Sequence, residues 1–313
     1  MTQKMPMKKR RQDIWEEDCK CRRYLEDTSD ADLAQRFRDI LFNCHTVTKT
    51  GQLGFVTDSG AMQRWLPLLS HIRVEFNLRG GTPAGLASRE DLPFISYPKP
   101  PTGYEILSGK SLPRKGLFKL GKKEHLATMF EEGQVRIAPA SSYGDPSLNP
   151  AIQDEELFIS TIALKSEISA NAVNKETSKT GPKLEILGNV RITESCFDFY
   201  VYCMSERYDY RLLDDFEATA LVAVHDHKIF AERLLHGIKE TYGDGYKYMW
   251  VPVYYIDPYN FDPSCLSPYF GKHFRYSYQK EMRFLMVPNS DQDEVLEEFY
   301  INIGPMTDIA ELY

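Results

Sequence analysis

The chain has few cysteines, no long apolar run and no internal repeat, and each absence excludes a class of protein. Six cysteines lie at irregular spacings among 313 residues, which is typical of reduced thiols in a cytoplasm and not of a disulfide framework. No stretch approaches the ~20 apolar residues of a membrane span. The basic start, Met1 to Arg11, is not followed by the apolar run of a secretory signal. We therefore expect a cytoplasmic protein without a membrane partner.

The chain also has fewer basic than acidic residues. The chain has 38 basic and 45 acidic residues, for a net charge of −7. Proteins whose main task is to coat nucleic acid depend on neutralising phosphates, so this balance argues weakly against that class. Apolar residues make up 42% of the chain, which is enough for a core of one large domain or two smaller ones.

Five prolines in residues 93–116 predict a connection between two parts of the chain. We expect a helical N-terminal extension over 1–112 and an α+β domain over 113–313. The first 27 residues are strongly charged, and we expect them to be partly disordered.

Two segments of the extension carry recognisable patterns. Ser29, with Asp32 at the capping-box position, predicts the start of an amphipathic helix over 30–43. Alternating apolar and polar residues predict a strand over 74–78.

Strands outnumber helices in the second part, which indicates a mostly antiparallel α+β fold. Helices are expected at 124–132, where Gly133 ends the helix, and at 229–241. Residues 170–183 are polar and are expected to form a loop tip. Strands are expected at 116–120, 134–138, 156–164, 184–192, 197–204, 220–224, 249–256, 281–287 and 298–303.

An arginine in the middle of an apolar strand is the first candidate site residue. Arg136 lies between Val135 and Ile137, and an exposed face of an edge strand is one explanation. The loop that follows contains Ser142, Tyr143 and Asp145, and it favours a binding role. Such a loop presents backbone N–H groups and an aromatic ring beside a side chain suited to bidentate phosphate contact.

A second dense group of charges lies near the C-terminus, at Lys272, Glu281 and Arg283. Glu281 and Arg283 share one face of a strand by the two-residue period. An exposed row of ion pairs is the alternative explanation. Phe284 and Leu285 make the strand a member of the core, so a covered, functional Glu281 is also expected.

Other polar groups carry less specific signals. Ser205 ends an apolar strand, where it either contacts a ligand or caps a turn. The acidic run 154–156 is interpreted as a solvated face without chemistry. The spacing of His225 and His227 matches no standard zinc site, so no metal is expected.

Taken in order, these motifs resemble a widespread uncharacterised bacterial family that is common in phage-defence neighbourhoods. The resemblance covers about 116–305. It rests on Gly133, Arg136, the Ser142–Pro146 turn, the Cys203–Ser205 strand end, Lys272 and the run Tyr278–Arg283. That family is similar in turn to the ADP-ribosyltransferase superfamily, including toxins that modify nucleic acid.

The resemblance implies a split sheet with a cleft that binds NAD as a substrate. Arg136 would grip the NAD phosphates or orient the acceptor, and Tyr143 would stack on nicotinamide or its ribose. Glu281 would bond the ribose and stabilise an oxocarbenium-like transition state. Ser205 would support the wall of the cleft. The remaining residues that we assign to NAD binding are Ser142, Asp145, Lys272 and Arg283.

The resemblance also implies a toxin or defence effector with a macromolecular acceptor, either nucleic acid or protein. The basic arm Lys8–Arg11 would assist a nucleic-acid acceptor, and residues 1–112 would bind an antitoxin or a defence-system partner. No Ser-Thr-Ser strand and no Glu-x-Glu pair is present, which argues against protein arginine as the target.

Two other classes of function remain open. A non-catalytic module that senses a nucleotide or a phage product would use Arg136 and Arg283 as phosphate clamps, with Glu281 as their partner. A metal-dependent nuclease would use Asp145, Asp154 and Glu156, although the sequence lacks the Asp/Glu-x-Lys spacing typical of such enzymes.

Overall fold

The computed structural model describes residues 11–57, 59–83, 86, 97–113, 116–260, 262–289 and 295–313. The chain forms two compact units. Unit 1 comprises Met1–His45, Phe55–Ile95 and Ile162–Val190, and unit 2 comprises Thr46–Gly54, Ser96–Thr161 and Arg191–Tyr313. The domain boundary expected at residue 112 stays a prediction. Residues 8–10 of the basic arm lie outside the described residues.

Unit 1 contains the helices α1 (Arg11–Arg22), α2 (Asp30–Cys44) and α3 (Ser59–Leu78). The N-cap predicted for α2 is confirmed, because the Ser29 hydroxyl accepts a hydrogen bond from the Asp32 N–H at 3.1 Å. Within the charged start, residues 1–27, which was expected to be partly disordered, Arg11–Arg22 are helical. There α1 buries Cys19 and packs against α3.

The strand predicted over 74–78 is also wrong, because these residues end α3. A window of five residues fits both periods, but helical spacing places the buried Ile72 and Phe76 one turn apart. The buried Glu75 carboxylate then pairs with Arg79 Nε at 2.8 Å, which is again an i,i+4 contact.

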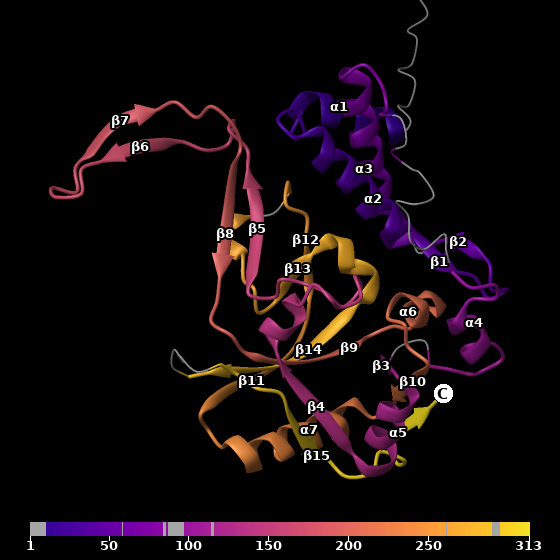
Figure 1. Cartoon of the computed structure of the whole chain (residues 1–313). Helices are drawn as coiled ribbons and strands as arrows, with labels where there is room; N and C mark the ends of the chain where they lie inside the picture. The colour runs from indigo at the N-terminus through magenta and orange to yellow at the C-terminus, as the bar shows by residue number, and fades with distance from the viewer. Residues whose placement is uncertain are drawn as a thin grey trace, which may run out of the picture. The chain divides into compact units, whose positions relative to one another are not determined.

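Residues 170–183 were expected to form a polar loop tip, and with Leu184 they instead form a β-hairpin. Strand β6 (Ala170–Val173) pairs antiparallel with β7 (Thr180–Leu184) (Figure 1). All five residues of β7 are exposed. A hairpin without a covered face has no apolar alternation, so the sequence gives no strand signal here.

Unit 2 is built on an eight-stranded sheet with antiparallel pairings, which confirms the α+β class. The strand order is β11-β14-β9-β3-β10-β16, with β4 paired to β9 and β15 paired to β4. The strands are β3 (Leu117–Gly121), β4 (Gln134–Pro139), β9 (Tyr200–Ser205), β10 (Ala220–Val224), β11 (Tyr246–Pro252), β14 (Glu281–Pro288), β15 (Phe299–Asn302) and β16 (Ala310–Leu312).

Shorter elements complete the described chain. The strands are β1 (His45–Val47), β2 (Leu53–Phe55), β5 (Phe158–Ala163), β8 (Val190–Ser195), β12 (Tyr254–Ile256) and β13 (Gly271–His273). The pairs are β1–β2, β5–β8 and the parallel β12–β13. The helices are α4 (Thr102–Leu107), α6 (Tyr210–Asp215) and the 3-10 turns η3 (Ala140–Gly144), η4 (Pro263–Cys265) and η5 (Phe274–Gln279). No helix in the described ranges has the length and apolar character needed to span a bilayer.

Strand β9 is the point at which the sheet divides. One edge of β9 pairs with β14 along its whole length. The other edge is shared, because Tyr200 and Val201 pair with β4 while Ser205 pairs with Phe118 of β3. The residues between them, Tyr202, Cys203 and Met204, pair with neither strand on this edge. We call this segment of β9 the fork.

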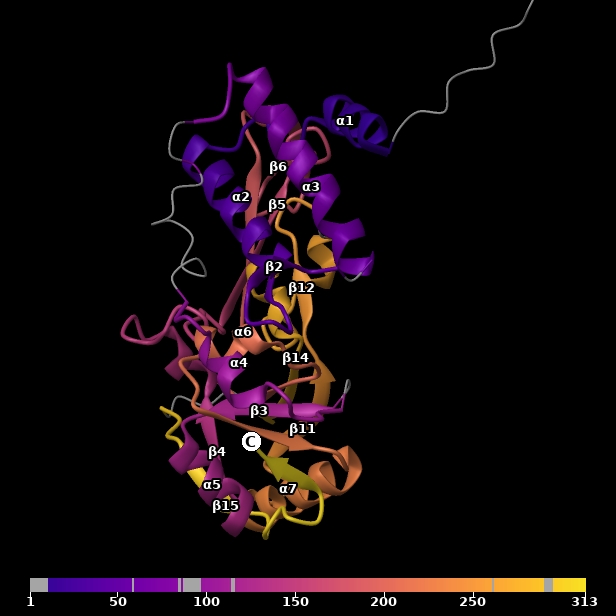
Figure 2. The ribbon, with the colours of Figure 1, turned by 90° about the vertical axis from the view of Figure 1, so that its right-hand side faces the viewer.

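The two faces of the sheet differ in character. One face is apolar and is covered by α5 (Lys123–Glu132) and α7 (His227–Tyr242), which lie on the same side of the sheet (Figures 1 and 2). The other face begins with an apolar group around Val201 and Leu285. By the two-residue period, Cys203, Glu281 and Arg283 continue that face toward the fork.

The entry into β4 depends on a glycine, as predicted. Gly133 ends α5 with a φ of 77°, and a Cβ at this position would lie 2.1 Å from the Gly304 carbonyl oxygen. Neither condition suits a residue with a side chain, so this turn fixes where β4 and Arg136 begin.

Candidate functional site

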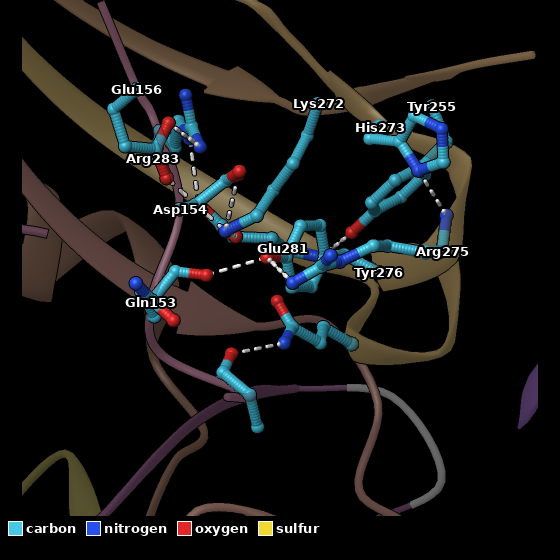
Figure 3. A network of polar contacts seen from close by, with 12 residues as sticks. Gln153, Asp154, Glu156, Tyr255, Lys272, His273, Arg275, Tyr276, Glu281 and Arg283 are labelled. Atoms are coloured by element: carbon cyan, nitrogen blue, oxygen red, sulfur yellow. Dashed lines mark hydrogen bonds and ion pairs between the residues drawn. The ribbon is translucent and has the colours of Figure 1, made fainter. Parts of the chain in front are cut away.

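Five charged side chains of unit 2 meet on the face of the sheet opposite α5 and α7, and we call them the ion cluster (Figure 3). Glu281 and Arg283 come from β14, and Lys272 comes from β13. Asp154 and Glu156 come from the segment that precedes β5. Three separate parts of the chain therefore contribute to one polar group.

The Lys272 ammonium contacts three carboxylates of the ion cluster. Its Nζ lies 3.1 Å from Glu156 Oε1 and 3.1 Å from Glu281 Oε2. A third contact, at 3.5 Å, reaches Asp154 Oδ2. Three carboxylates around one ammonium match its three N–H donors.

The Arg283 guanidinium completes a closed ring of four side chains, which are Lys272, Glu156, Arg283 and Glu281. Its Nε donates to Glu281 Oε1 at 2.6 Å, and its Nη2 donates to Glu156 Oε2 at 2.5 Å. Each of these two glutamates therefore gives one oxygen to Lys272 and the other to Arg283. Alternating charges in a ring leave no like pair in direct contact.

Burial makes this ring different from a surface network. The side chains of Arg283, Lys272 and Glu281 are 0%, 5% and 6% exposed, whereas Asp154 is 18% exposed. Charges removed from water are stable only when closely paired, because desolvation costs several kcal/mol per ion. Three carboxylates against two cations leave a formal charge of −1 when Asp154 is ionised.

The environment moves the pKa values of two acids in opposite directions. Burial opposes ionisation of Glu281, but Arg283 and then Lys272 outweigh it and hold the pKa of Glu281 below its ordinary value. Burial dominates at Asp154, where it raises the pKa from 3.8 to about 6 despite Lys272. One acid of the cluster is thus firmly ionised, and another titrates near neutral pH.

Tyrosines surround the cluster and fix its backbone. The Tyr255 hydroxyl accepts a hydrogen bond from the Glu281 N–H at 2.8 Å. The ring of Tyr276 lies 4.6 Å from Lys272 Nζ, and its hydroxyl donates to the Gln153 carbonyl (Figure 3). Gln279 donates to the Ala151 carbonyl at 2.7 Å, which ties the acidic segment to η5.

Two predicted residues of the sheet lie beside Glu281. Ser205 is buried and stands directly opposite Glu281 in the β9–β14 register. Cys203 pairs with Arg283 in the same register, so its side chain shares the face of Glu281. Tyr143, in η3, is half-buried and interacts electrostatically with both Arg136 and Glu281.

Arg136 lies outside the ion cluster. The register of β4 on β9 puts it on the same face as Val201, and hence as Glu281. Its side chain is 51% exposed and its Nε donates to the Glu298 carboxylate at 2.8 Å. The side chain is therefore exposed, as the alternative explanation holds, but β4 is not an edge strand, because it pairs with both β9 and β15.

Ser142 and Asp145 are exposed and serve the local turn. The Ser142 hydroxyl donates to the Pro139 carbonyl at 2.7 Å. Asp145 accepts a hydrogen bond from the Ser147 N–H at 2.8 Å, which lowers its pKa. Both residues shape the loop that carries Tyr143.

The acidic segment was misjudged from sequence. We predicted a solvated face over 154–156, but Glu156 is 5% exposed and completes the ring, while Glu155 is exposed. The sequence did contain a signal for this second acid. The predicted group held two cations, Lys272 and Arg283, but only one carboxylate, Glu281. A buried pair of cations requires a second carboxylate from elsewhere in the chain.

The three acids assigned to the nuclease alternative do not lie together as metal ligands. Asp154 and Glu156 contact Lys272 and Arg283, while Asp145 serves its own turn. Over the described ranges, no three or more His, Cys, Asp or Glu side chains are arranged to hold a metal ion.

Comparison with protein-family models, with curated proteins and with solved structures gives no match for this chain. The resemblance based on its motifs therefore stays an expectation, and the site has to be judged by its own geometry.

Proposed function

We propose that this chain is an NAD-dependent enzyme of the ADP-ribosyltransferase type that modifies a macromolecule as a toxin or phage-defence effector. One observation carries the proposal. Glu281 is a buried carboxylate held in its ionised form at the start of a central strand, on the face that bears Arg136. An ionised carboxylate in a dry site stabilises positive charge that develops on a ribose.

The proposed reaction breaks the bond between the nicotinamide nitrogen and ribose C1′. The bonding electron pair leaves with nicotinamide, which becomes neutral, and C1′ acquires oxocarbenium character beside Glu281. A nucleophilic atom of the acceptor then bonds to C1′ and loses a proton. Asp154 is our candidate for receiving that proton, because its pKa is raised to about 6 and its side chain is 18% exposed.

The remaining residues receive supporting roles in this proposal. Lys272 and Arg283 keep Glu281 ionised, and Ser205 forms the wall opposite it. Tyr143 stacks on nicotinamide or its ribose, on a turn built by Ser142 and Asp145. Arg136 is assigned to the acceptor, because its side chain is exposed.

Three broader assignments accompany the site. The divided edge of β9 supports the split-sheet cleft that the resemblance implies. All six cysteines are free thiols, which supports a cytoplasmic location. Nucleic acid is the favoured acceptor, and residues 1–112 are assigned to binding an antitoxin or defence partner.

A nucleotide-sensing module is the second candidate, and one observation favours it. Both oxygens of Glu281 already accept hydrogen bonds from cations, so the carboxylate has partners before any ligand arrives. In a sensor, Arg136 and Arg283 would hold phosphate and no bond would be broken.

The test is incubation of the full chain with labelled NAD and separate pools of DNA, RNA and cell protein. We expect label on one pool with the wild type, and at least a ~100-fold loss with Glu281→Gln. Glu281→Asp keeps the charge of the ring and should retain intermediate activity. Equal transfer by wild type and Glu281→Gln would refute the proposal. Absence of both transfer and nicotinamide release by a folded wild type would favour the sensor.

A further inference from the structure

The β6–β7 hairpin is a two-stranded sheet without a covered face, and we call residues 170–184 the basic hairpin. In the part of the chain that the structure describes, its two strands pair only with each other. None of its residues is buried, and even Val173 and Leu184 are 60% and 48% exposed. An isolated two-stranded hairpin is only marginally stable in water, so contact with a partner would stabilise it.

Asn174 shapes the tip of the basic hairpin. Its side-chain oxygen accepts hydrogen bonds from the N–H groups of Glu176 at 2.9 Å and Thr177 at 3.0 Å. Its carbonyl oxygen accepts from the Ser178 N–H at 2.8 Å, and its own N–H donates to the Lys179 carbonyl at 3.0 Å. The turn is therefore formed before a partner binds, which lowers the entropic cost of binding.

The basic hairpin has a charge opposite in sign to that of the chain. Its charged residues are Lys175, Glu176, Lys179 and Lys183, three positive and one negative, which gives +2. The whole chain carries −7, so the residues outside the hairpin together carry −9. A local patch of positive charge on an acidic protein directs an anionic partner to that patch.

The three lysines of the basic hairpin are not engaged within the chain. Over the described ranges, their exposed side chains form no ion pair and no hydrogen bond with another side chain. Lys165, which precedes the hairpin, differs, because its Nζ lies 3.0 Å from Asp27 Oδ2. The next acids along the chain, Glu167 and Glu185, lie outside the two strands. The positive charge of the hairpin is therefore available to a partner.

The lysines are spread along the basic hairpin and are not gathered on one face. Lys175 and Lys179 belong to the tip, whereas Lys183 lies in β7 opposite Asn171. The major groove of B-DNA is about 12 Å wide and admits a two-stranded ribbon, with phosphates along both of its walls. Lysines at the tip and along the ribbon can each reach a phosphate in that position.

We infer that the basic hairpin binds duplex DNA, with its strands in the major groove and its three lysines on phosphates. Lysine suits this contact as a flexible point charge, and phosphate contacts specify no base sequence. DNA is favoured over duplex RNA, because side chains cannot read the narrow major groove of A-form RNA. The inference names DNA as the acceptor class, a link that rests on the proposed function, whereas DNA binding itself requires no NAD.

The experiment measures binding of the full chain to a fluorescent duplex DNA by anisotropy over a series of salt concentrations. Three lysine–phosphate contacts should contribute about −3 to the slope of log K against log salt. Lys175→Met, Lys179→Met and Lys183→Met should each weaken binding several-fold at low salt, and each should reduce the slope by about 1. Glu176→Gln should strengthen binding, because it removes the one negative charge of the hairpin.

The chain provides a matched control for these variants. Lys110 is also exposed and forms no ion pair within the described residues, but it lies outside the basic hairpin. Lys110→Met removes the same charge from the protein and should bind DNA within about twofold of the wild type. Circular dichroism should show that every variant is folded, because all of the changed side chains are exposed.

The outcomes separate the hairpin from the catalytic proposal. An unchanged slope in all three lysine variants would overturn the inference, as would tighter binding to duplex RNA than to duplex DNA. DNA binding that depends on the hairpin lysines, without nicotinamide release from NAD, would support the hairpin and refute the transferase. Nicotinamide release by a folded wild type that does not bind DNA would overturn the inference and leave the transferase standing.

Discussion

The ion cluster and the Arg136–Glu298 pair are two solutions to the same problem, a charged side chain on a strand. Arg283 is 0% exposed and gives hydrogen bonds to two glutamates, while Arg136 is 51% exposed and pairs with one. Both arginines contact carboxylates through Nε, so the type of contact does not distinguish them. Burial does, because it decides how strongly each charge depends on its partners.

This difference sets the energetic scale of the two regions. Exposed ion pairs contribute about 0–1 kcal/mol, since water and salt screen them. Removing one member of a buried pair typically costs about 3–5 kcal/mol, because its partner is left as an uncompensated charge. The comparison can therefore be tested by removing matched groups from each region.

The largest effect is expected from Arg283→Met. The change leaves Glu156 and Glu281 with Lys272 alone, and it should lower the free energy of unfolding by about 3–5 kcal/mol. Urea denaturation followed by circular dichroism would measure it. A loss below about 1 kcal/mol would place the ring in the same class as a surface pair.

A double-mutant cycle sharpens the comparison further. For Lys272→Met and Glu156→Gln we expect a coupling energy of about 1–3 kcal/mol, because the two groups are in contact within the ring. The same cycle on Arg136 and Glu298 should give less than about 1 kcal/mol. Equal coupling in the two cycles would contradict the role given to burial.

Stability should depend on pH through Asp154 in an unusual direction. Its pKa is raised from 3.8 to about 6, so the folded state holds an extra proton between these values and loses stability as pH rises through them. Asp154→Asn should gain stability relative to the wild type by roughly 1–3 kcal/mol between pH 4 and pH 7. Thermal unfolding across this range would show it.

Glu281 should give stability the opposite dependence on pH, and it serves as a control in the same titration. Its lowered pKa stabilises the fold above the ordinary pKa of glutamate, and this contribution is lost as pH falls through the lowered value. The Asp154→Asn variant should keep this loss at low pH. A difference between variant and wild type that stays flat from pH 4 to pH 7 would show that Asp154 does not titrate in that window.

The smallest effect is expected from Arg136→Met. Removal of the exposed pair with Glu298 should change the free energy of unfolding by no more than about 1 kcal/mol, and less at high salt. Urea denaturation at low and high ionic strength would measure the change. A salt-independent loss of several kcal/mol would mean that Arg136 has a structural role.

The sequence predicted those parts of the fold whose signals are local. The Ser29 cap, the Gly133 stop and the apolar strand of Leu285 each depend on a few neighbouring residues. The end of α3 was missed because five alternating residues carry too little information to exclude a helix. The β6–β7 hairpin was missed because none of its strand residues is buried.

The candidate site was only half predictable for the same reason. Glu281 and Arg283 share a strand, so their common face followed from the two-residue period. Glu156 also contacts Arg283, but the two residues are 127 positions apart in the chain. No local sequence pattern encodes that contact. The fork in β9 depends on the pairing of three strands and became visible only in the sheet.

The measurement that tests the central claim most directly is nicotinamide release from NAD by the wild type, Glu281→Gln and Glu155→Gln in parallel. Glu155 is the exposed neighbour of Glu156 and provides the same chemical change outside the ring. We predict that the wild type and Glu155→Gln release nicotinamide at similar rates, and that folded Glu281→Gln is at least ~100-fold slower. Equal release by all three proteins, or none from a folded wild type, would contradict the assignment of Glu281 as the catalytic carboxylate.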